Sequence, residues 1–142
     1  MKVLTIQEPW ASLIVNGYKE YEFRSWKTNY RGKILIHAGL TFDKKNKDRF
    51  LSYNLDYGKG EIIGEAEIVD CIKVNKEFHE FLLKKDYNVY KTSGFDEVYA
   101  FKLTNIKKYD NRIRVKGKLN LWNYEKWNNI IWKSKCKIRS KY

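Results

Sequence analysis

The chain has 142 residues, and a single domain of this size buries roughly two-thirds of its unfolded surface without metal ions or disulfides. Hydrophobic residues make up 43% of the sequence, which excludes an intrinsically disordered protein. The 29 Lys and Arg residues outnumber 17 acidic residues and give a net charge of +12, which favours a nucleic-acid partner. The alternative is a lysine-rich surface that only keeps the protein soluble, and clustering of the charge on one face would distinguish the two.

Membrane, disulfide and metal signals are all missing from the sequence. No apolar run approaches the roughly 18 residues of a membrane span, and the N-terminus lacks the apolar core of a signal peptide. Cys71 and Cys136 form no close pair, and His37 and His79 are the only histidines. We therefore expect a cytoplasmic monomer with reduced thiols, no membrane contact, no metal and no cofactor.

The first elements are well marked in the sequence. Residues 3–6 form a short apolar run, and Pro9 stands where the fixed backbone angle of proline suits the first turn of a helix. Trp10, Leu13 and Ile14 then recur at helical spacing, and Gly17 is placed as a C-terminal cap. The pattern predicts a strand over residues 3–6 and a helix over residues 9–16.

Farther along, short strands alternate with helices. We expect an extended segment over 17–26, strands over 33–37, 61–69, 98–103 and 112–121, a polar helix over 42–53, a helix capped by Asn75, and a C-terminal helix beginning after Asn123. Because strands dominate and helices lie between them, the predicted fold is mixed α+β and mainly β, a small barrel flanked by short helices.

The densest group of polar and aromatic residues lies at 17–26. On an extended segment Glu22, Arg24 and Trp26 point to one face. A carboxylate and a guanidinium supply fixed hydrogen bonds, and an indole supplies a stacking surface, so together they can hold a planar polar ring. Lys19 and Trp10 lie close in sequence. The alternative is an exposed hairpin that carries only a Glu–Arg ion pair.

A basic stripe is predicted near the C-terminus. A strand over 112–121 would place Arg112, Arg114, Lys116 and Lys118 on one face and the apolar Ile113, Val115 and Leu119 on the other. Such a stripe is typical of contact with a phosphate backbone, although a merely solvated strand face has the same pattern. Further basic residues follow in the tail: Lys133, Lys135, Lys137, Arg139 and Lys141.

The spacing Gly17-x-Lys19-x-x-Glu22-x-Arg24 resembles the signature of the ASCH domain family, which is related in fold to the PUA RNA-binding domains. Four further segments, 7–14, 30–39, 63–71 and 115–122, are similar to family segments in the same order. We therefore expect an ASCH domain over residues 1–124. Residues 125–142 would form a basic helix or tail, packed on this domain or extending from it.

The resemblance implies a PUA-like β-barrel with a cleft between the barrel and its first helix, lined by Lys19, Glu22 and Arg24. Family members are thought to bind RNA or modified nucleosides, and some resemble amidohydrolases that remove the acetyl group of N4-acetylcytidine. In those enzymes the signature lysine acts with a threonine nucleophile three residues later. Here that position is Glu22, so the nucleophile is not carried over, although a carboxylate can serve as a base for water.

The sequence thus favours a module that binds RNA, another single-stranded nucleic acid or a nucleoside-like molecule. The ligand residues would be Lys19, Glu22, Arg24, Trp26, Trp10 and His37, with Arg112, Arg114, Lys116 and Lys118 on the phosphates. Because His37 ends a buried-looking strand, a core or cleft histidine is favoured over a catalytic base. Two alternatives remain open: a hydrolase or RNase that uses Lys19 and Glu22 as catalytic residues, and a protein-interaction domain whose basic surface meets an acidic partner.

Overall fold

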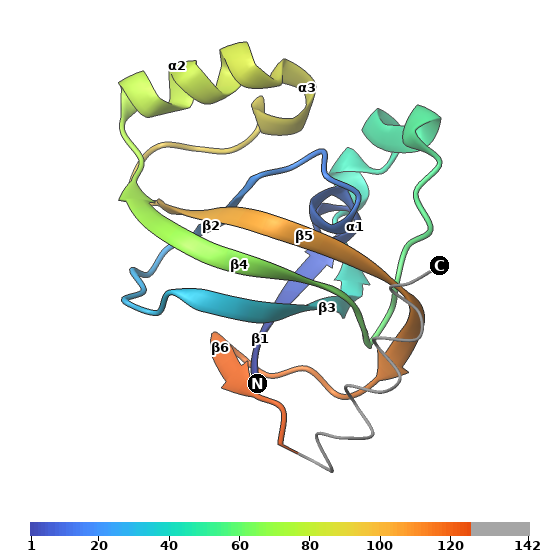
Figure 1. Ribbon diagram of the computed structural model, residues 1–142. Coiled ribbons are helices and arrows are strands. Elements are labelled where there is room, and N and C mark those ends of the chain that lie inside the picture. The colour runs from blue at the N-terminus through green and yellow to red at the C-terminus, as the bar shows by residue number, and fades with distance from the viewer. Residues whose placement is uncertain (126–142) are drawn as a thin grey trace.

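A computed structural model describes residues 1–125 of the chain (Figure 1). The expected C-terminal helix and the basic tail fall outside the described residues. The strands are β1 (Lys2–Glu8), β2 (Tyr21–Arg24), β3 (Gly32–Phe42), β4 (Glu61–Lys73), β5 (Tyr99–Arg114) and β6 (Leu121–Asn123). The helices are α1 (Trp10–Val15), α2 (Lys76–Lys85) and α3 (Tyr87–Tyr90), with two 3₁₀ segments, η1 (Lys44–Asn46) and η2 (Asp48–Tyr53).

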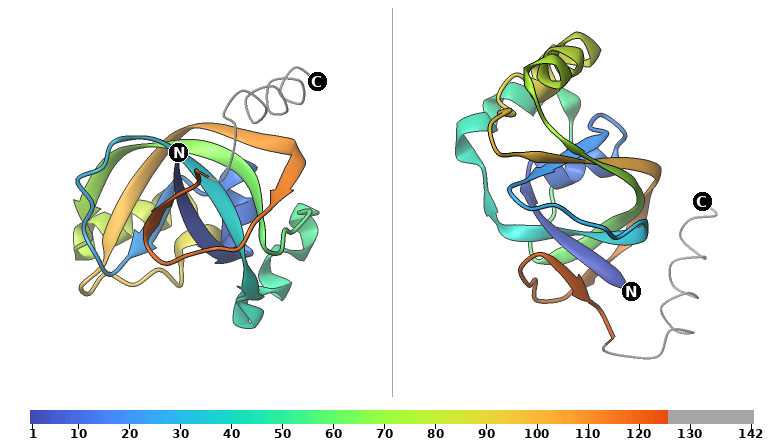
Figure 2. Two further views of the ribbon diagram at one scale, coloured as in Figure 1. Left: turned by 90° about the horizontal axis from the view of Figure 1, so that it is seen from below. Right: turned by 90° about the vertical axis from the view of Figure 1, so that its left-hand side faces the viewer.

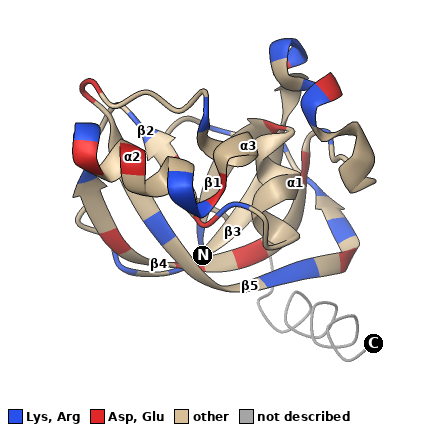
Figure 3. Ribbon diagram, turned by 90° about the horizontal axis from the view of Figure 1, so that it is seen from above, with Lys and Arg blue, Asp and Glu red and all other residues tan. Residues whose placement is uncertain are grey.

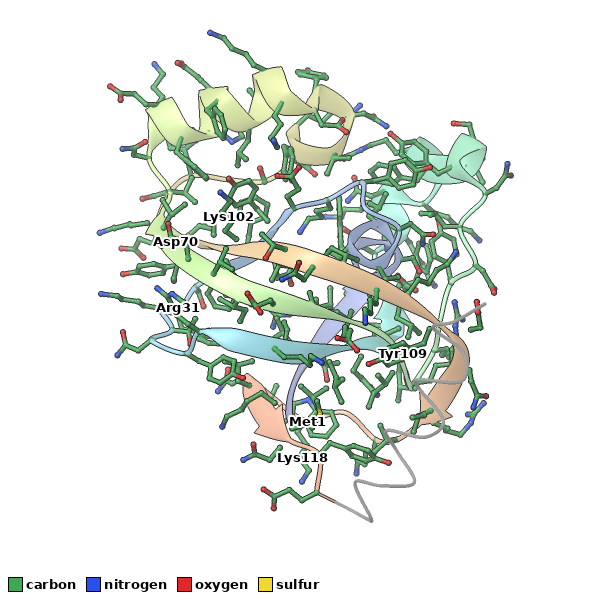
Figure 4. The ribbon with its side chains drawn as sticks, in the orientation of Figure 1. Met1, Arg31, Asp70, Lys102, Tyr109 and Lys118 are labelled. Carbon is green, nitrogen blue, oxygen red and sulfur yellow. The ribbon has the colours of Figure 1, made fainter. Side chains whose placement is uncertain are left out.

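The strands form one sheet in the order β2-β5-β4-β3-β1-β6. Strands β1 and β3 are parallel, and the other neighbours are antiparallel. Cross-strand partners include Asp70 on β4 and Lys102 on β5, which Figure 4 shows at one end of these strands. Two further views show how strongly the sheet curls (Figure 2).

The helix α1 forms the centre of the core. Its residues from Ala11 to Val15 are buried, and it contacts β1, β3, β4 and β5. Gly17 adopts a left-handed φ of +85°, and its N–H donates to the Ile14 carbonyl at 3.0 Å. Glycine takes this conformation at little cost, so it ends the helix and turns the chain towards β2. The predicted helix and its glycine cap are confirmed.

Apolar side chains from the curled strands pack around this helix. Leu4, Ile36, Ile63 and Phe101, which come from β1, β3, β4 and β5, are fully buried in one cluster with Ile14. Because each cluster member leaves water on folding, this packing is the main stabilising term for the fold.

The sheet is not closed into a barrel, so that part of the fold prediction is wrong, whereas a mainly β fold with a few short helices is confirmed. The two edge strands, β2 and β6, have only four and three residues. Strand β6 pairs with β1 only from Lys2 to Leu4. From Thr5 onwards the outer edge of β1 therefore lacks a strand partner, and a gap remains between it and β2.

Two local predictions also differ from the structure. The polar helix over 42–53 is replaced by η1 and η2. The predicted strand over 112–121 does not exist as one element, because β5 ends at Arg114 and β6 begins at Leu121. Leu119, expected on an apolar face, is 88% exposed in the intervening loop. The cap of α2 agrees with expectation, since the Asn75 side chain accepts the Phe78 N–H.

Candidate functional site

A cavity of about 1040 Å³ opens in the gap between β1 and β2. Its walls include residues 5–7 of β1 and residues 22–24 of β2. It continues along the C-terminal part of β3 to η1, and the segments 92–94 and 116–119 complete it. All six residues expected to bind a ligand line this one cavity: Lys19, Glu22, Arg24, Trp26, Trp10 and His37.

The Glu22 carboxylate joins two cations at the wall of the cavity. Its Oε1 accepts a hydrogen bond from Lys19 Nζ at 2.9 Å, and its Oε2 accepts from Arg24 Nε and Nη2 at 3.1 and 2.9 Å. Lys19 Nζ also donates to the Tyr21 carbonyl. The Lys19 and Glu22 residues are only 3% and 7% exposed. The alternative prediction of an exposed hairpin is therefore wrong, because Lys19 and Glu22 are buried.

The ionisation of this trio follows from its burial and its charges. Burial raises the pKa of Glu22, but the Lys19 ammonium and the Arg24 guanidinium outweigh it and hold that pKa below its usual value. Burial lowers the pKa of Lys19, and the Glu22 carboxylate opposes that shift. With Glu22 ionised and both cations protonated, the trio carries one net positive charge, which favours an anionic or carbonyl-bearing ligand.

Arg24 spans the gap in the sheet. Its Nη2 donates to the Thr5 carbonyl of β1 at 2.7 Å, as well as to Glu22. No residue within 1–125 accepts a hydrogen bond from Nη1 of Arg24, and the side chain is 22% exposed. Because a guanidinium has five N–H donors in a fixed plane, Nη1 is available to an acceptor in the cavity while the rest of the group is fixed.

Two tryptophans flank the trio in different ways. Trp26 packs its half-buried ring edge-on against Phe101, with centroids 5.1 Å apart. Trp10 donates from Nε1 to Asp43 at 3.1 Å, and the cations of Lys19 and Arg49 lie 5.8 and 5.4 Å from its ring. Since Trp10 already interacts with two cations of the protein, Trp26 is the better stacking surface for a ligand.

His37 is held as one neutral tautomer. Its Nε2 lies 2.6 Å from the Val115 carbonyl, which can only accept, so Nε2 carries the proton. Its Nδ1, which is unprotonated in this tautomer, lies 3.2 Å from Thr5 Oγ1, so the hydroxyl donates to Nδ1 while its oxygen accepts from Trp122 Nε1 at 3.0 Å. Burial lowers the pKa of His37, which keeps the ring neutral. Both ring nitrogens are occupied, so His37 forms a wall of the cavity and not a free base.

The predicted basic stripe is divided between two places. Lys116 and Lys118 lie in the loop beside the cavity, and Figure 4 shows Lys118 at the β6 end of the molecule. Arg112 instead pairs with Glu61 at 3.3 Å and Asp56 at 3.7 Å. Arg114 is exposed outside the cavity lining. In the view of Figure 3, Lys and Arg are spread over several elements.

Other polar residues of the site were not recognised from the sequence. Asp43 and Asn46 line the far end of the cavity, and Asp43 Oδ2 accepts from Asn46 as well as from Trp10. Outside the cavity lining, buried Glu8 accepts from Ser12 and from the Gly58 N–H, which connects α1 to the loop before β4. An acidic residue directly before Pro9 is the one local signal for the Glu8 contacts, because a carboxylate suits a helix N-terminus.

The model of the ASCH domain matches residues 4–137 of the chain. The chain belongs to the ASCH domain family. The crystal structure of ASCH from Zymomonas mobilis is similar with a TM-score of 0.60 at 16% identity, covering 94% of this chain and 93% of that one. A single-residue variant of that protein has the same TM-score and identity, with 94% of each chain covered.

Curated relatives of this ASCH chain include activating signal cointegrator 1 from Homo sapiens and from Mus musculus. The human protein is 35% identical over 92 residues, and the mouse protein is 33% identical over 89 residues. Each match covers 54% of this chain and 15% of the relative's length. Most of each relative therefore lies outside the match.

Residues 1–125 contain neither a membrane-spanning helix nor a cluster of metal-binding side chains. None of the helices there is long and apolar enough to cross a membrane. The same residues contain no group of three or more His, Cys, Asp and Glu side chains placed to hold a metal ion.

Proposed function

We propose that this ASCH domain binds RNA by accepting one unpaired nucleobase in the cavity between β1 and β2. Arg24 donates from Nη1 to an acceptor on the base, and Trp26 stacks on the ring. Lys116 and Lys118 bind the adjoining phosphates. The observation that carries this proposal is the convergence on one cavity of the Lys19–Glu22–Arg24 trio, an indole and two lysines that form no ion pair within residues 1–125.

In this proposal the three signature residues have different roles. Lys19 is almost fully buried and donates to Glu22 and to the Tyr21 carbonyl. Its role is to hold the Glu22 carboxylate in place. Glu22 in turn fixes the plane of the Arg24 guanidinium through two hydrogen bonds. A donor held in this way loses little conformational entropy when it binds a ligand.

A hydrolase that acts on a modified nucleoside or on RNA is the second candidate. It is favoured by the ionised Glu22 beside a buried lysine at a cavity wall, where a carboxylate can activate water. It is weakened by the low pKa of Glu22, which makes that carboxylate a poor base, and by hydrogen bonds that already engage both of its oxygens.

Binding of short single-stranded RNAs to the wild-type chain and to Arg24→Ala and Trp26→Ala tests the proposal. Both variants should bind more weakly, because Arg24→Ala removes a charged hydrogen-bond donor to the base, and the base stack lost in Trp26→Ala costs roughly 1–3 kcal/mol. A control substitution, Lys76→Ala on the exposed part of α2, should leave the affinity unchanged. Equal RNA affinity of the wild type and all three variants would show that RNA does not bind in the cavity.

Turnover of N4-acetylcytidine, measured in parallel, tests the second candidate. Release of acetate that is abolished by Glu22→Gln and by Lys19→Ala would favour the hydrolase. Turnover that is indifferent to both substitutions would exclude them as catalytic residues.

A further inference from the structure

Two leucines at the mouth of the cavity are left in solvent. Leu40 is 70% exposed and Leu119 is 88% exposed, and both line the cavity. A single exposed leucine is ordinary on a protein surface. Two of them on one cavity, next to Lys116 and Lys118, form a surface that is both apolar and cationic. We call Leu40, Lys116, Lys118 and Leu119 the outer rim.

Several contacts fix the outer rim to the sheet. The Val115 N–H donates to the Gly60 carbonyl at 3.2 Å, and the Val115 carbonyl accepts a hydrogen bond from His37 Nε2. Gly60 also lies against Leu40, since a Cβ at this glycine would be 2.9 Å from Leu40 Cδ2. Leu40 and the beginning of the loop are therefore held on the same side of the cavity.

Gly117 anchors the middle of the same loop. A Cβ at this position would lie 2.8 Å from Thr5 Oγ1 and 2.9 Å from a ring carbon of His37, so the backbone packs directly on these two residues. Both flanking lysines are exposed, and Lys118 Nζ lies 5.9 Å from the centre of the Trp122 ring. Among residues 1–125, no acidic side chain forms an ion pair with Lys116 or Lys118. The rim thus presents two unneutralised charges beside two apolar side chains on a fixed backbone.

The cavity is also large for a single base. Sites that hold one drug-sized molecule have volumes of roughly 300–1,000 Å³, and this cavity of about 1040 Å³ lies just above that range. A nucleotide combines an apolar base face and sugar edge with an anionic phosphate. That combination matches the leucines and lysines of the outer rim.

We propose that the outer rim binds a second nucleotide, the neighbour in the strand of the one held at Arg24. Leu40 and Leu119 contact its base and sugar, and Lys116 and Lys118 each bind one of the two phosphates of the 5′-phosphorylated dinucleotide unit. The ligand is then an unpaired run of at least two nucleotides and not a free nucleoside. This inference rests on the proposed function of the inner cavity and goes beyond it in naming the length of the ligand.

Calorimetric titration with three kinds of probe tests the inference. The probes are the four ribonucleoside 5′-monophosphates, the corresponding 3′,5′-bisphosphates, and 5′-phosphorylated dinucleotides. A bisphosphate adds a phosphate without a second base, so it separates charge from base contact. The wild-type chain should bind its preferred dinucleotide at least about tenfold more tightly than the matching bisphosphate, which is about 1.4 kcal/mol.

A double variant, Leu40→Ala with Leu119→Ala, should reduce this advantage to less than threefold and leave monophosphate affinity unchanged. Both residues are exposed, so the fold should tolerate the change. The matched control is Leu51→Ala, because Leu51 is 64% exposed and does not line the cavity. It should keep the full advantage.

The outcomes separate the two proposals. If monophosphates bind and depend on Arg24, but dinucleotides bind no better than bisphosphates, the outer rim is excluded and the inner site stands. If the double variant keeps the higher affinity for the dinucleotide, Leu40 and Leu119 do not contact the second nucleotide. If none of the probes binds, or if binding ignores Arg24→Ala, the proposed function fails and the outer rim fails with it.

Discussion

The Arg24 guanidinium on β2 donates to the backbone carbonyl of Thr5 on β1 at 2.7 Å, across the place where the sheet fails to close. A side chain thus replaces the backbone ladder that a closed barrel would have there. A backbone ladder would fill the gap, whereas a guanidinium held by Glu22 crosses it and leaves room for a cavity. The open sheet and the candidate site therefore have the same origin.

Replacement of Arg24 by lysine tests this bridge. A lysine keeps the charge but lacks the planar fork, so it cannot donate twice to Glu22 Oε2 and also to the Thr5 carbonyl with the same geometry. We expect Arg24→Lys to lower the free energy of unfolding by about 1–3 kcal/mol, measured by urea denaturation. Arg114→Lys, at an exposed position, is the control and should change it by less than about 0.5 kcal/mol.

The pH dependence of stability tests the ionisation of Glu22. The pKa of Glu22 is lowered in the folded protein, so the ionised carboxylate stabilises the fold at pH values above its usual pKa of 4.5. That contribution is lost as the pH falls from 4.5 through the lowered pKa, because the folded state must then take up the proton. The free energy of unfolding of the wild type minus that of Glu22→Gln should therefore shrink over this range.

Above pH 5 the same difference should be large, since Glu22→Gln leaves the buried Lys19 ammonium without its counter-charge, and breaking a buried pair costs about 3–5 kcal/mol. Glu80→Gln, an exposed position on α2, controls for the loss of one negative charge. A Glu22→Gln difference that stays constant from pH 3 to 7 would contradict an ionised Glu22.

The Thr5 hydroxyl connects two side chains at the wall of the cavity by hydrogen bonds. It accepts from Trp122 Nε1 and donates to His37 Nδ1. Thr5→Val keeps the shape but leaves both partners unsatisfied, so we expect a loss of about 1–3 kcal/mol in the free energy of unfolding. Thr5→Ser keeps the hydroxyl and should retain most of the stability. Similar losses in both variants would assign the effect to packing of the missing methyl group.

The local parts of the fold could be predicted because their signals are local. Pro9 and Gly17 bound the first helix within nine residues, and Asn75 caps α2 through its own side chain. Lys19, Glu22 and Arg24 are close in sequence, and a short extended strand is enough to bring them together. The contacts of Asp43 with Trp10 and of Thr5 with Trp122 depend on the fold of the whole chain.

The end of β5 shows why a period of two is an incomplete guide. Alternation of basic and apolar residues continues to Leu119, but the strand ends at Arg114. The physical reason lies at Gly117, whose lack of a side chain lets the backbone pack on Thr5 and His37. This long-range contact turns the chain away from β4 and takes Leu119 into solvent, which the local pattern does not encode.

Salt dependence distinguishes general electrostatics from the fitted site. Each phosphate of a single-stranded RNA that the protein neutralises contributes about −0.7 to the slope of log affinity against log salt concentration. Replacement of both Lys116 and Lys118 by alanine should therefore flatten the slope by about 1.4 and weaken binding to all RNA sequences alike. Trp26→Ala should instead lower affinity for the preferred base and leave the slope unchanged, because a lost stack releases no counterions.

The control for this last prediction is a double substitution of Lys73 and Lys76, which are exposed and do not line the cavity. It removes the same two charges from the net charge of +12. If the phosphates lie at the outer rim, this control should leave the slope within about 0.3 of the wild-type value, since counterions are released only where charges meet phosphates. Equal flattening by both double variants would mean that the RNA responds to overall charge, and the lysines of the rim would then have no special place in binding.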